Sequence, residues 1–177
     1  MIYFIGEVSM FFLVLSDSHG TPNLIKRAWN IQVSVPDGII FLGDGLRDLW
    51  AFAEEKPFVP IFAVRGNCDW TGSLPNAQLV PISDTYNFEG VRVFSAHGHT
   101  YSVKAGTDSL LKAGSRAKAN VILYGHTHIQ ETHWENPGGE AIQLCNPGSL
   151  KDNGEFATLT LQNGQALIGL GQLTDIF

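Results

Sequence analysis

Short apolar runs in this chain repeatedly stop at residues that can bind a metal ion. The runs are rich in Val, Ile and Phe, which is typical of strands buried on both faces of a sheet. They cover residues 11–15, 39–42, 61–64, 91–96 and 121–124. The donor residues that follow them are Asp17, Asp44, Asn67, His97 and His126. Chance rarely places a donor after each of several strands, so this repeat predicts both the sheets and one functional edge.

The first half of the chain alternates between strands and helices. Helix-compatible stretches lie between the first three runs, at residues 22–33 and 47–55. Such an alternation predicts a parallel sheet with right-handed crossovers. Open sheets of this kind bind ligands at the carboxyl ends of their strands, which is where the donor residues stand.

The second half of the chain changes character. A helix is predicted over residues 104–118. Short strands are predicted at residues 129–134, 141–145, 156–161 and 165–170. Segments 136–139 and 162–164 are rich in Asn and Gly, which is typical of hairpin turns. We therefore expect a mostly antiparallel second sheet packed on the first, with helices outside.

The length of 177 residues fits one domain with a sizeable core. We expect that domain to cover residues 10–177, preceded by an N-terminal extension, residues 1–9, to which the pattern assigns no role. The apolar stretch of residues 1–15 is interrupted by Glu7. It is also shorter than the ~20 apolar residues of a membrane span, so we expect no membrane partner.

Charge and cysteine usage restrict the partners and the compartment. A net charge of −6 argues against capture of a nucleic acid polymer, which needs a basic surface. One basic cluster has the spacing of a solvated helix face: Lys104, Lys112, Arg116 and Lys118. Cys68 and Cys145 lack the number and spacing of a disulfide framework or a zinc ribbon. A reducing compartment suits them, so we expect a cytoplasmic protein.

The donor residues are too many for one first-row ion and suit two ions that share a bridge. They are Asp17, His19, Asp44, Asn67, His97, His99, His126 and His128. Carboxylate and imidazole ligands without thiolate suit Mn²⁺, Fe, Co²⁺, Ni²⁺ or Zn²⁺. Two such ions about 3.5–4 Å apart activate a bridging water and polarise phosphoryl oxygens. The residue types therefore predict displacement at phosphorus.

Each motif by itself also has a structural interpretation. Asp17 can begin a turn and cap the following helix, and segments 43–45 and 66–69 are common turns. The pairs His97-Gly98-His99 and His126-Thr127-His128 are harder to explain in this way, because paired histidines after a buried strand have little structural use. The joint occurrence of all motifs in this order favours the metal site.

The ordered motifs resemble the calcineurin-like metallophosphoesterase superfamily. They are Asp17-x-His19, Gly43-Asp44, Gly66-Asn67, His97-Gly98-His99 and Gly125-His126-Thr127-His128. The short length, the Gly66-Asn67-Cys68-Asp69 variant and Asn146-Pro147-Gly148-Ser149 resemble its small, cap-less prokaryotic phosphodiesterase branch. The resemblance covers the chain from about residue 10 to its end. It implies an α/β fold, a four-layer α/β/β/α sandwich of two mixed β-sheets with helices on both outer faces.

The resemblance also implies the ligand set and the activity. The first metal would be held by Asp17, His19 and His128, the second by Asn67, His97 and His126, and Asp44 would bridge the two. The implied reaction is hydrolysis of a small phosphodiester by a hydroxide held between two divalent ions. Manganese is the first choice, with nickel, iron, cobalt or zinc as alternatives. Homo-oligomers are common in this family.

One departure from the family pattern affects the mechanism. Much of the superfamily has a histidine directly after the asparagine, where this chain has Cys68. A thiol is a poor general acid near neutral pH, so diesters are favoured over monoesters with poor leaving groups. We expect Asp44 and His99 to be catalytic. His99 either takes over part of the acid's role or orients His97 or a substrate oxygen.

Several alternatives stay open at this level. Cys68 is either a soft extra ligand or, as we favour, a small buried residue beside the site. Asp69 either supports the metal loop through hydrogen bonds or caps a turn, and Arg65 either meets a phosphate or is a surface charge. A non-catalytic scaffold, as in a membrane-trafficking subunit that resembles this branch, and a phosphomonoesterase are the other candidate functions. The complete set of ligand positions argues against a scaffold with a decayed site.

Overall fold

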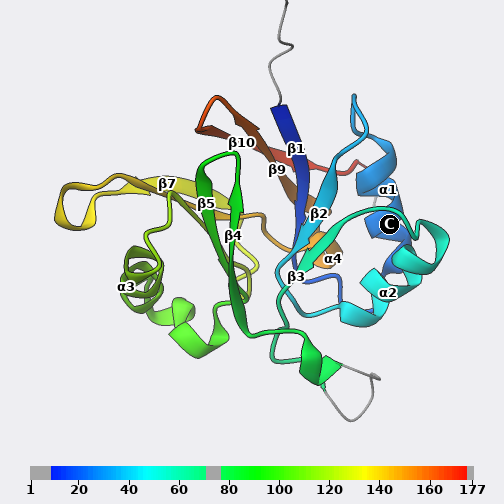
Figure 1. Cartoon of the computed structure of the whole chain (residues 1–177). Coiled ribbons are helices and arrows are strands. Elements are labelled where there is room, and N and C mark those ends of the chain that lie inside the picture. Colours follow the sequence, from blue (N-terminus) through cyan, green and yellow to red (C-terminus); the bar gives the residue numbers. More distant parts are fainter. Residues whose placement is uncertain (1–8, 71–76, 175–177) are drawn as a thin grey trace, which may run out of the picture.

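Two five-stranded sheets lie face to face, with helices on the two outer faces (Figure 1). The structure is a computed structural model that describes residues 9–70 and 77–174. It has the four-layer α/β/β/α architecture with two mixed sheets, so the expected fold class is confirmed. Residues 1–8 of the expected N-terminal extension lie outside the described residues, and Ser9 is the first residue of β1.

The first sheet has the strand order β10-β9-β1-β2-β3. Its strands are β1 (Ser9–Leu15), β2 (Gly38–Phe41), β3 (Ile61–Ala63), β9 (Glu155–Gln162) and β10 (Gln165–Gln172). The expected parallel pairing of the first three strands is confirmed. The crossovers α1 (Pro22–Asn30) and α2 (Leu46–Glu55) cover the outer face of this sheet (Figure 1).

The second sheet has the strand order β4-β5-β6-β8-β7. Its strands are β4 (Ser83–Phe88), β5 (Val91–Ala96), β6 (Val121–Leu123), β7 (Glu131–Glu135) and β8 (Ile142–Asn146). The expectation of a mostly antiparallel second sheet is wrong, because β5, β6 and β8 run parallel. The hairpin of β9 and β10 joins the first sheet instead, where β9 pairs with β1. β1 is buried along most of its length and needs a strand at each edge, and β9 covers the edge that β2 leaves open.

The connections agree with the expected turns but not with the expected helix. In the β9–β10 hairpin, Asn163 and Gly164 have positive φ values of 53° and 72°. The 3-10 turn η4 (Pro137–Gly139) joins β7 and β8. Instead of one helix over residues 104–118, the 3-10 turns η2 (His99–Tyr101) and η3 (Val103–Ala105) precede α3 (Asp108–Arg116). Gly106 separates η3 from α3, because its φ of 138° is incompatible with a right-handed helix.

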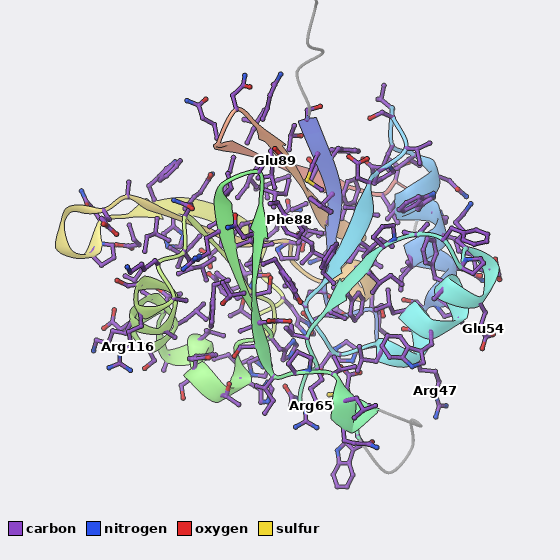
Figure 2. The ribbon with its side chains drawn as sticks, in the orientation of Figure 1. Arg47, Glu54, Arg65, Phe88, Glu89 and Arg116 are labelled. Carbon is purple, nitrogen blue, oxygen red and sulfur yellow. The ribbon has the colours of Figure 1, made fainter. Side chains whose placement is uncertain are left out.

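Apolar side chains fill the spaces between the four layers. In β1, Phe12 and Val14 face the second sheet, whereas Leu13 and Leu15 face α1 and α2. Phe88, at the end of β4, reaches between the sheets, and its ring centroid lies 4.6 Å from that of Phe12 (Figure 2). A third cluster lies between the second sheet and α3. Burial on both faces of each sheet determines where the strands end, and therefore where their donor residues stand.

The structure bears on the cysteines and on the basic cluster. Cys145 lies in the core between the sheets and Cys68 is exposed, and both are free. The basic residues expected on a solvated face are exposed, and they are Lys104, Lys112, Arg116 and Lys118. Within residues 9–70 and 77–174, no helix has the length and apolar character of a membrane span.

Candidate metal centre

The expected donor residues meet at one edge of the sandwich, formed by strand ends from both sheets. The carboxyl ends of β1, β2, β3, β5 and β6 lead to Asp17, Asp44, Asn67, His97 and His126, respectively. Backbone hydrogen bonds join the loops, as between the N–H of Asp17 and the carbonyl of Gly43 at 3.0 Å. Arg65, in the loop after β3, is labelled at this edge in Figure 2.

Asp17, His19 and His128 form a first cluster of donors. Oδ1 of Asp17 lies 3.1 Å from Nε2 of His128 and 3.5 Å from Nε2 of His19. One ligand atom from each of these residues lies within 4.8 Å of the others. The three side chains can therefore reach one ion without a change in the backbone.

Asp44, His97 and His126 form a second cluster, with ligand atoms that also lie within 4.8 Å of one another. Nε2 of His97 lies 3.3 Å from Oδ2 of Asp44 and 4.0 Å from Oδ1 of Asp17. Nε2 of His19, from the first cluster, lies 3.9 Å from Oδ2 of Asp44. Asp44 thus stands between the two clusters.

The other two expected residues border these clusters. Asn67 is exposed on the loop after β3, and its amide nitrogen donates to Sγ of Cys68 at 3.2 Å. His99 begins η2, and its ring centroid lies 5.4 Å from that of His97 and 6.1 Å from that of His126. Nδ1 of His99 is buried and has no hydrogen-bond partner among the described residues.

The donor set fits a pair of divalent cations. Asp17 and Asp44 are 0% and 3% exposed. In the described part of the chain, every ion pair that these two carboxylates make within 4.0 Å is with a histidine. Buried carboxylates without a Lys or Arg partner are costly, and a bound cation would offset their charge. Nε2 of His97 is also buried and without a hydrogen-bond partner in the described residues, and it faces Asp44.

Electrostatics divide the donors into two groups. Hydrogen bonding to Asp17 raises the pKa of His19. Burial lowers the pKa of His97, but contact with Asp44 outweighs it and raises that pKa above its ordinary value.

At the other donors with a shifted pKa, the protonation state that binds metal is favoured. Burial raises the pKa of Asp44, but contact with His97 and the N–H of Cys68 outweighs it and holds that pKa below its ordinary value. Burial, assisted by the charge of His97, lowers the pKa of His126 to about 4. The same two causes lower the pKa of His99. Ionised carboxylates and neutral imidazoles are the forms that coordinate a metal.

The backbone at the donors adopts a conformation that L-residues rarely take. Positive φ values between 40° and 71° occur at Asp17, His19, Asp44, His126 and His128. The left-handed region costs a non-glycine residue roughly 1–2 kcal/mol. Strain of this kind clusters at functional sites, where the surrounding structure enforces it. The backbone therefore supports the same residues that the side-chain chemistry singles out.

Two glycines allow the loops after β2 and β3 to approach each other. A Cβ on Gly66 would lie 2.0 Å from Oδ1 of Asp44. A Cβ on Gly43, whose φ is 96°, would lie 2.5 Å from the backbone nitrogen of Gly66. Any side chain at either position would separate the loops, which explains why a glycine precedes both Asp44 and Asn67.

The sequence pattern of a known family, the calcineurin-like phosphoesterase superfamily domain, matches residues 10–164. The chain belongs to the calcineurin-like phosphoesterase superfamily. Its two clusters of His and Asp donors are typical of the dinuclear metal sites of that superfamily. No curated protein matches the chain in a sequence comparison.

Solved structures of similar fold come from proteins of different kinds. A conserved uncharacterized protein of Streptococcus pneumoniae, described as a predicted phosphoesterase, is 22% identical, with 93% of this chain and 90% of that chain covered and a TM-score of 0.74. An archaeal phosphodiesterase is 23% identical, with 92% and 100% covered and a TM-score of 0.64. Vacuolar Protein Sorting 29 of Cryptosporidium parvum is 14% identical, with 93% and 98% covered and a TM-score of 0.67. At these identities the likeness shows the fold alone.

Asp69 holds two loops of this superfamily member together. Its carboxylate accepts hydrogen bonds from the backbone N–H groups of Asp44 at 2.8 Å, Gly45 at 2.9 Å, Leu46 at 2.9 Å and Gly66 at 2.8 Å. These bonds satisfy donors at the start of α2 and join them to the loop after β3. The interpretation of Asp69 as a support of the metal loops is confirmed.

Cys68 differs from its favoured interpretation as a small buried residue, because it is exposed. Its neighbour Asp69 turns inward instead, and Cys68 comes to line a hollow of about 310 Å³ together with His19 and Asp44. The backbone N–H of Cys68 donates to Oδ1 of Asp44 at 2.7 Å. Partial burial of the thiol and the neighbouring Asp44 carboxylate raise the pKa of Cys68 to about 11.

Asp48 is a supporting residue that the sequence analysis missed. It is 3% exposed, and its carboxylate accepts hydrogen bonds from the hydroxyl of Ser18 at 2.6 Å and from the N–H of Gly20 at 2.8 Å. It thereby anchors the loop that carries His19. Ser18 and Gly20 lie 30 and 28 positions before Asp48 in the chain, so no local sequence pattern indicates these contacts.

Asp152 is the second supporting residue that was missed. Its Oδ2 lies 2.6 Å from Nδ1 of His128, which leaves Nε2 facing Asp17. Asp152 lies in α4 (Leu150–Asn153), whose N-cap Ser149 accepts its N–H at 3.1 Å and donates to the carbonyl of Asp17 at 3.3 Å. The segment 146–149 therefore approaches the site, as expected. The Ser149-x-x-Asp152 spacing, typical of a capping box, was the available signal.

We expect Asp152→Ala to weaken the binding of one metal ion by about 10- to 100-fold, the usual effect of removing the partner that orients a ligating histidine. Without the carboxylate, the imidazole of His128 is free to rotate and to change tautomer. Equilibrium dialysis with Mn²⁺ or Zn²⁺ measures the change. Asp108→Ala, which removes an exposed carboxylate from α3, is the matched control. An equal effect in both variants would contradict the role of Asp152.

Proposed function

We propose that the protein is a dinuclear metal-dependent phosphodiesterase. The observation that carries the proposal is the pair of donor clusters on either side of Asp44, whose buried carboxylates have only histidines as ion-pair partners in the described residues. In this proposal Asp17, His19 and His128 hold the first ion, Asn67, His97 and His126 hold the second, and Asp44 bridges them. Manganese is the first choice for these oxygen and nitrogen donors, with nickel, iron, cobalt or zinc as alternatives.

The side chains at the site have separable tasks. Two bound divalent ions would supply a nucleophile at neutral pH and offset negative charge on the phosphoryl oxygens. Asp44, as a proposed catalytic residue, would hold both ions and supply one negative charge between them. His99 is the second proposed catalytic residue. Burial and the charge of His97 lower the pKa of His99, and a neutral ring beside His97 and His126 supports the role of orienting a substrate oxygen over that of an acid.

Two features of the site support a small phosphodiester as the substrate. A proton donor works best with a pKa near the operating pH, and the pKa of the Cys68 thiol is raised to about 11. Without an imidazolium at that position, a diester is the better substrate than a monoester with a poor leaving group. The hollow lined by His19, Asp44 and Cys68 has a volume of about 310 Å³. That volume lies at the lower end of the range for small-molecule sites, roughly 300–1,000 Å³.

A metal-binding scaffold is the second candidate function, since the fold is shared with Vacuolar Protein Sorting 29. A scaffold does not need a complete set of metal ligands. Here each proposed ligand position carries a donor, including His19 in the first cluster. The complete set supports the enzyme over the scaffold.

Metal removal and return tests the proposal. Protein stripped with a chelator is assayed on a chromogenic phosphodiester and on its matching monoester, with Mn²⁺, Ni²⁺ or Zn²⁺ returned singly. We expect no hydrolysis without metal and restored hydrolysis with metal, faster for the diester. Faster hydrolysis of the monoester would contradict the substrate class. No hydrolysis with any metal, in protein shown to be folded by circular dichroism, would favour the scaffold.

A further inference from the structure

Cys68 stands where a sulfur atom can reach the proposed first ion. Its Sγ, one ring nitrogen of His19 and one carboxylate oxygen of Asp44 all lie within 4.8 Å of one another. The backbone N–H of Cys68 donates to Oδ1 of Asp44 at 2.7 Å, and its Sγ accepts from the side-chain amide of Asn67 at 3.2 Å. These contacts hold the thiol beside the donors, in a hollow that His19 and Asp44 also line.

A buried nitrogen without a partner indicates a cation at the same carboxylate. His97 is 0% exposed, and its Nδ1 lies 2.7 Å from the carbonyl oxygen of Leu42, which fixes the ring. Its Nε2 has no hydrogen-bond partner in the described residues and lies 3.3 Å from Oδ2 of Asp44. The ring cannot turn to solvent, so a cation bound at Asp44 would satisfy this nitrogen. In the proposed function that cation is the second ion, which Asp44 shares with the first. Asp44 is also the residue that Cys68 contacts.

We propose that Cys68 is a thiolate ligand of the first metal ion and makes that position selective for zinc or cobalt over manganese. This inference rests on the proposed function, in which His19 and Asp44 already bind that ion. Zinc binds sulfur at about 2.3 Å and nitrogen or oxygen at about 2.0–2.2 Å in a tetrahedral arrangement, so its ligand atoms lie roughly 3.3–3.7 Å apart. Atoms within 4.8 Å of one another reach that arrangement by small side-chain rotations.

The coordination step is balanced within the site and the solvent. The S–H bond of Cys68 breaks, its proton leaves to solvent, and the electron pair of the sulfur forms the bond to the divalent ion. The raised pKa of the metal-free thiol is no obstacle, because a bound cation deprotonates a coordinating thiol. A thiolate is a soft donor that favours zinc and cobalt over manganese. The second ion has only nitrogen and oxygen donors and lacks this preference.

Cobalt spectroscopy tests the sulfur ligand directly. Metal-stripped protein is titrated with Co²⁺, and a thiolate-to-cobalt charge-transfer band is expected in the near ultraviolet. The band should be absent in Cys68→Ser and retained in Cys145→Ala, since Cys145 lies in the core between the sheets. In competitive dialysis, Cys68→Ser should reduce the preference for Zn²⁺ over Mn²⁺ on the order of 10- to 100-fold. Loss of a residue that only orients a ligand already lowers metal affinity by that factor, and loss of a ligand should do at least as much.

The outcomes separate this inference from the proposed function. Two cobalt ions bound per chain with no charge-transfer band, or a band that persists in Cys68→Ser, would overturn the sulfur ligand and leave the dinuclear centre intact. No cobalt binding by folded protein would overturn the centre itself. A band lost only in Cys68→Ser, together with the loss of zinc preference, supports the inference.

Discussion

Asp44→Asn is expected to abolish metal-dependent hydrolysis while the protein stays folded. The carboxylate stands between the two donor clusters, with Oδ2 at 3.3 Å from Nε2 of His97 and at 3.9 Å from Nε2 of His19. The amide keeps the shape of the side chain and an oxygen acceptor for the N–H of Cys68. It loses the charge and the ability to bridge two cations. Bound metal ions stabilise the transition state by several kcal/mol. Losing that stabilisation would lower kcat/KM on the order of 10³-fold or more.

Two measurements on Asp44→Asn separate catalysis from folding. The first is the rate on a chromogenic diester with each metal returned to stripped protein. The second is the rise in melting temperature that added metal causes, since a ligand that binds only the folded state stabilises it. We expect Asp44→Asn to lose both and Asp108→Asn to keep both. A loss of several kcal/mol would leave much less than a tenth of the parent rate. A metal-dependent rate of Asp44→Asn above about that level would therefore rule out Asp44 as the bridge.

Asp69→Ala is expected to lower the free energy of unfolding of the metal-free protein by about 4 kcal/mol, because several backbone donors lose their acceptor together. Its carboxylate accepts hydrogen bonds from the N–H groups of Asp44, Gly45, Leu46 and Gly66 at 2.8–2.9 Å. Asp69 is only 6% exposed, so water replaces it poorly. The loops after β2 and β3 would then separate, and metal-dependent activity should fall as well.

Chemical denaturation of metal-free protein measures this effect. A loss of about 4 kcal/mol corresponds to a fall in melting temperature of roughly 8–16 °C for a chain of this size. Asp69→Asn is the matched variant, because it keeps the shape and one acceptor oxygen but turns an amide NH₂ toward some of the N–H groups. We expect its stability to lie between those of the parent and of Asp69→Ala. A change below about 1 kcal/mol in Asp69→Ala would show that water replaces the carboxylate.

The donor residues and the carboxylates that hold their loops have different roles. The donors themselves are strained, since Asp17, Asp44 and His128 have positive φ values of 56°, 58° and 61°. Carboxylates outside the donor set hold the strained loops through hydrogen bonds, and Asp69 and Asp152 are two of them. These hydrogen bonds keep the donors in place before any ion binds. Loss of a donor should therefore affect binding and catalysis first, whereas loss of Asp69 should affect folding first.

The sequence by itself determined the strands β1, β2, β3, β5 and β6 and the donor residues that follow them. This was possible because both signals are local. A buried strand shows itself as a continuous apolar run, and a donor such as Asp44 or His126 stands within three residues of the strand that delivers it. The hairpin turn at Asn163 and Gly164 was local in the same sense. The grouping of the donors followed because carboxyl ends of parallel strands meet at one edge.

Only the tertiary structure decided the features that depend on partners distant in the chain. β9 pairs with β1 across most of the sequence, which removed the last hairpin from the second sheet. Asp152 meets His128 across 24 positions, and Asp48 meets Ser18 across 30. The exposure of Cys68 depends on Asp69 turning inward to reach α2. A local pattern records what a residue can do, whereas its burial and its partners are set by how the layers pack, and packing is not local.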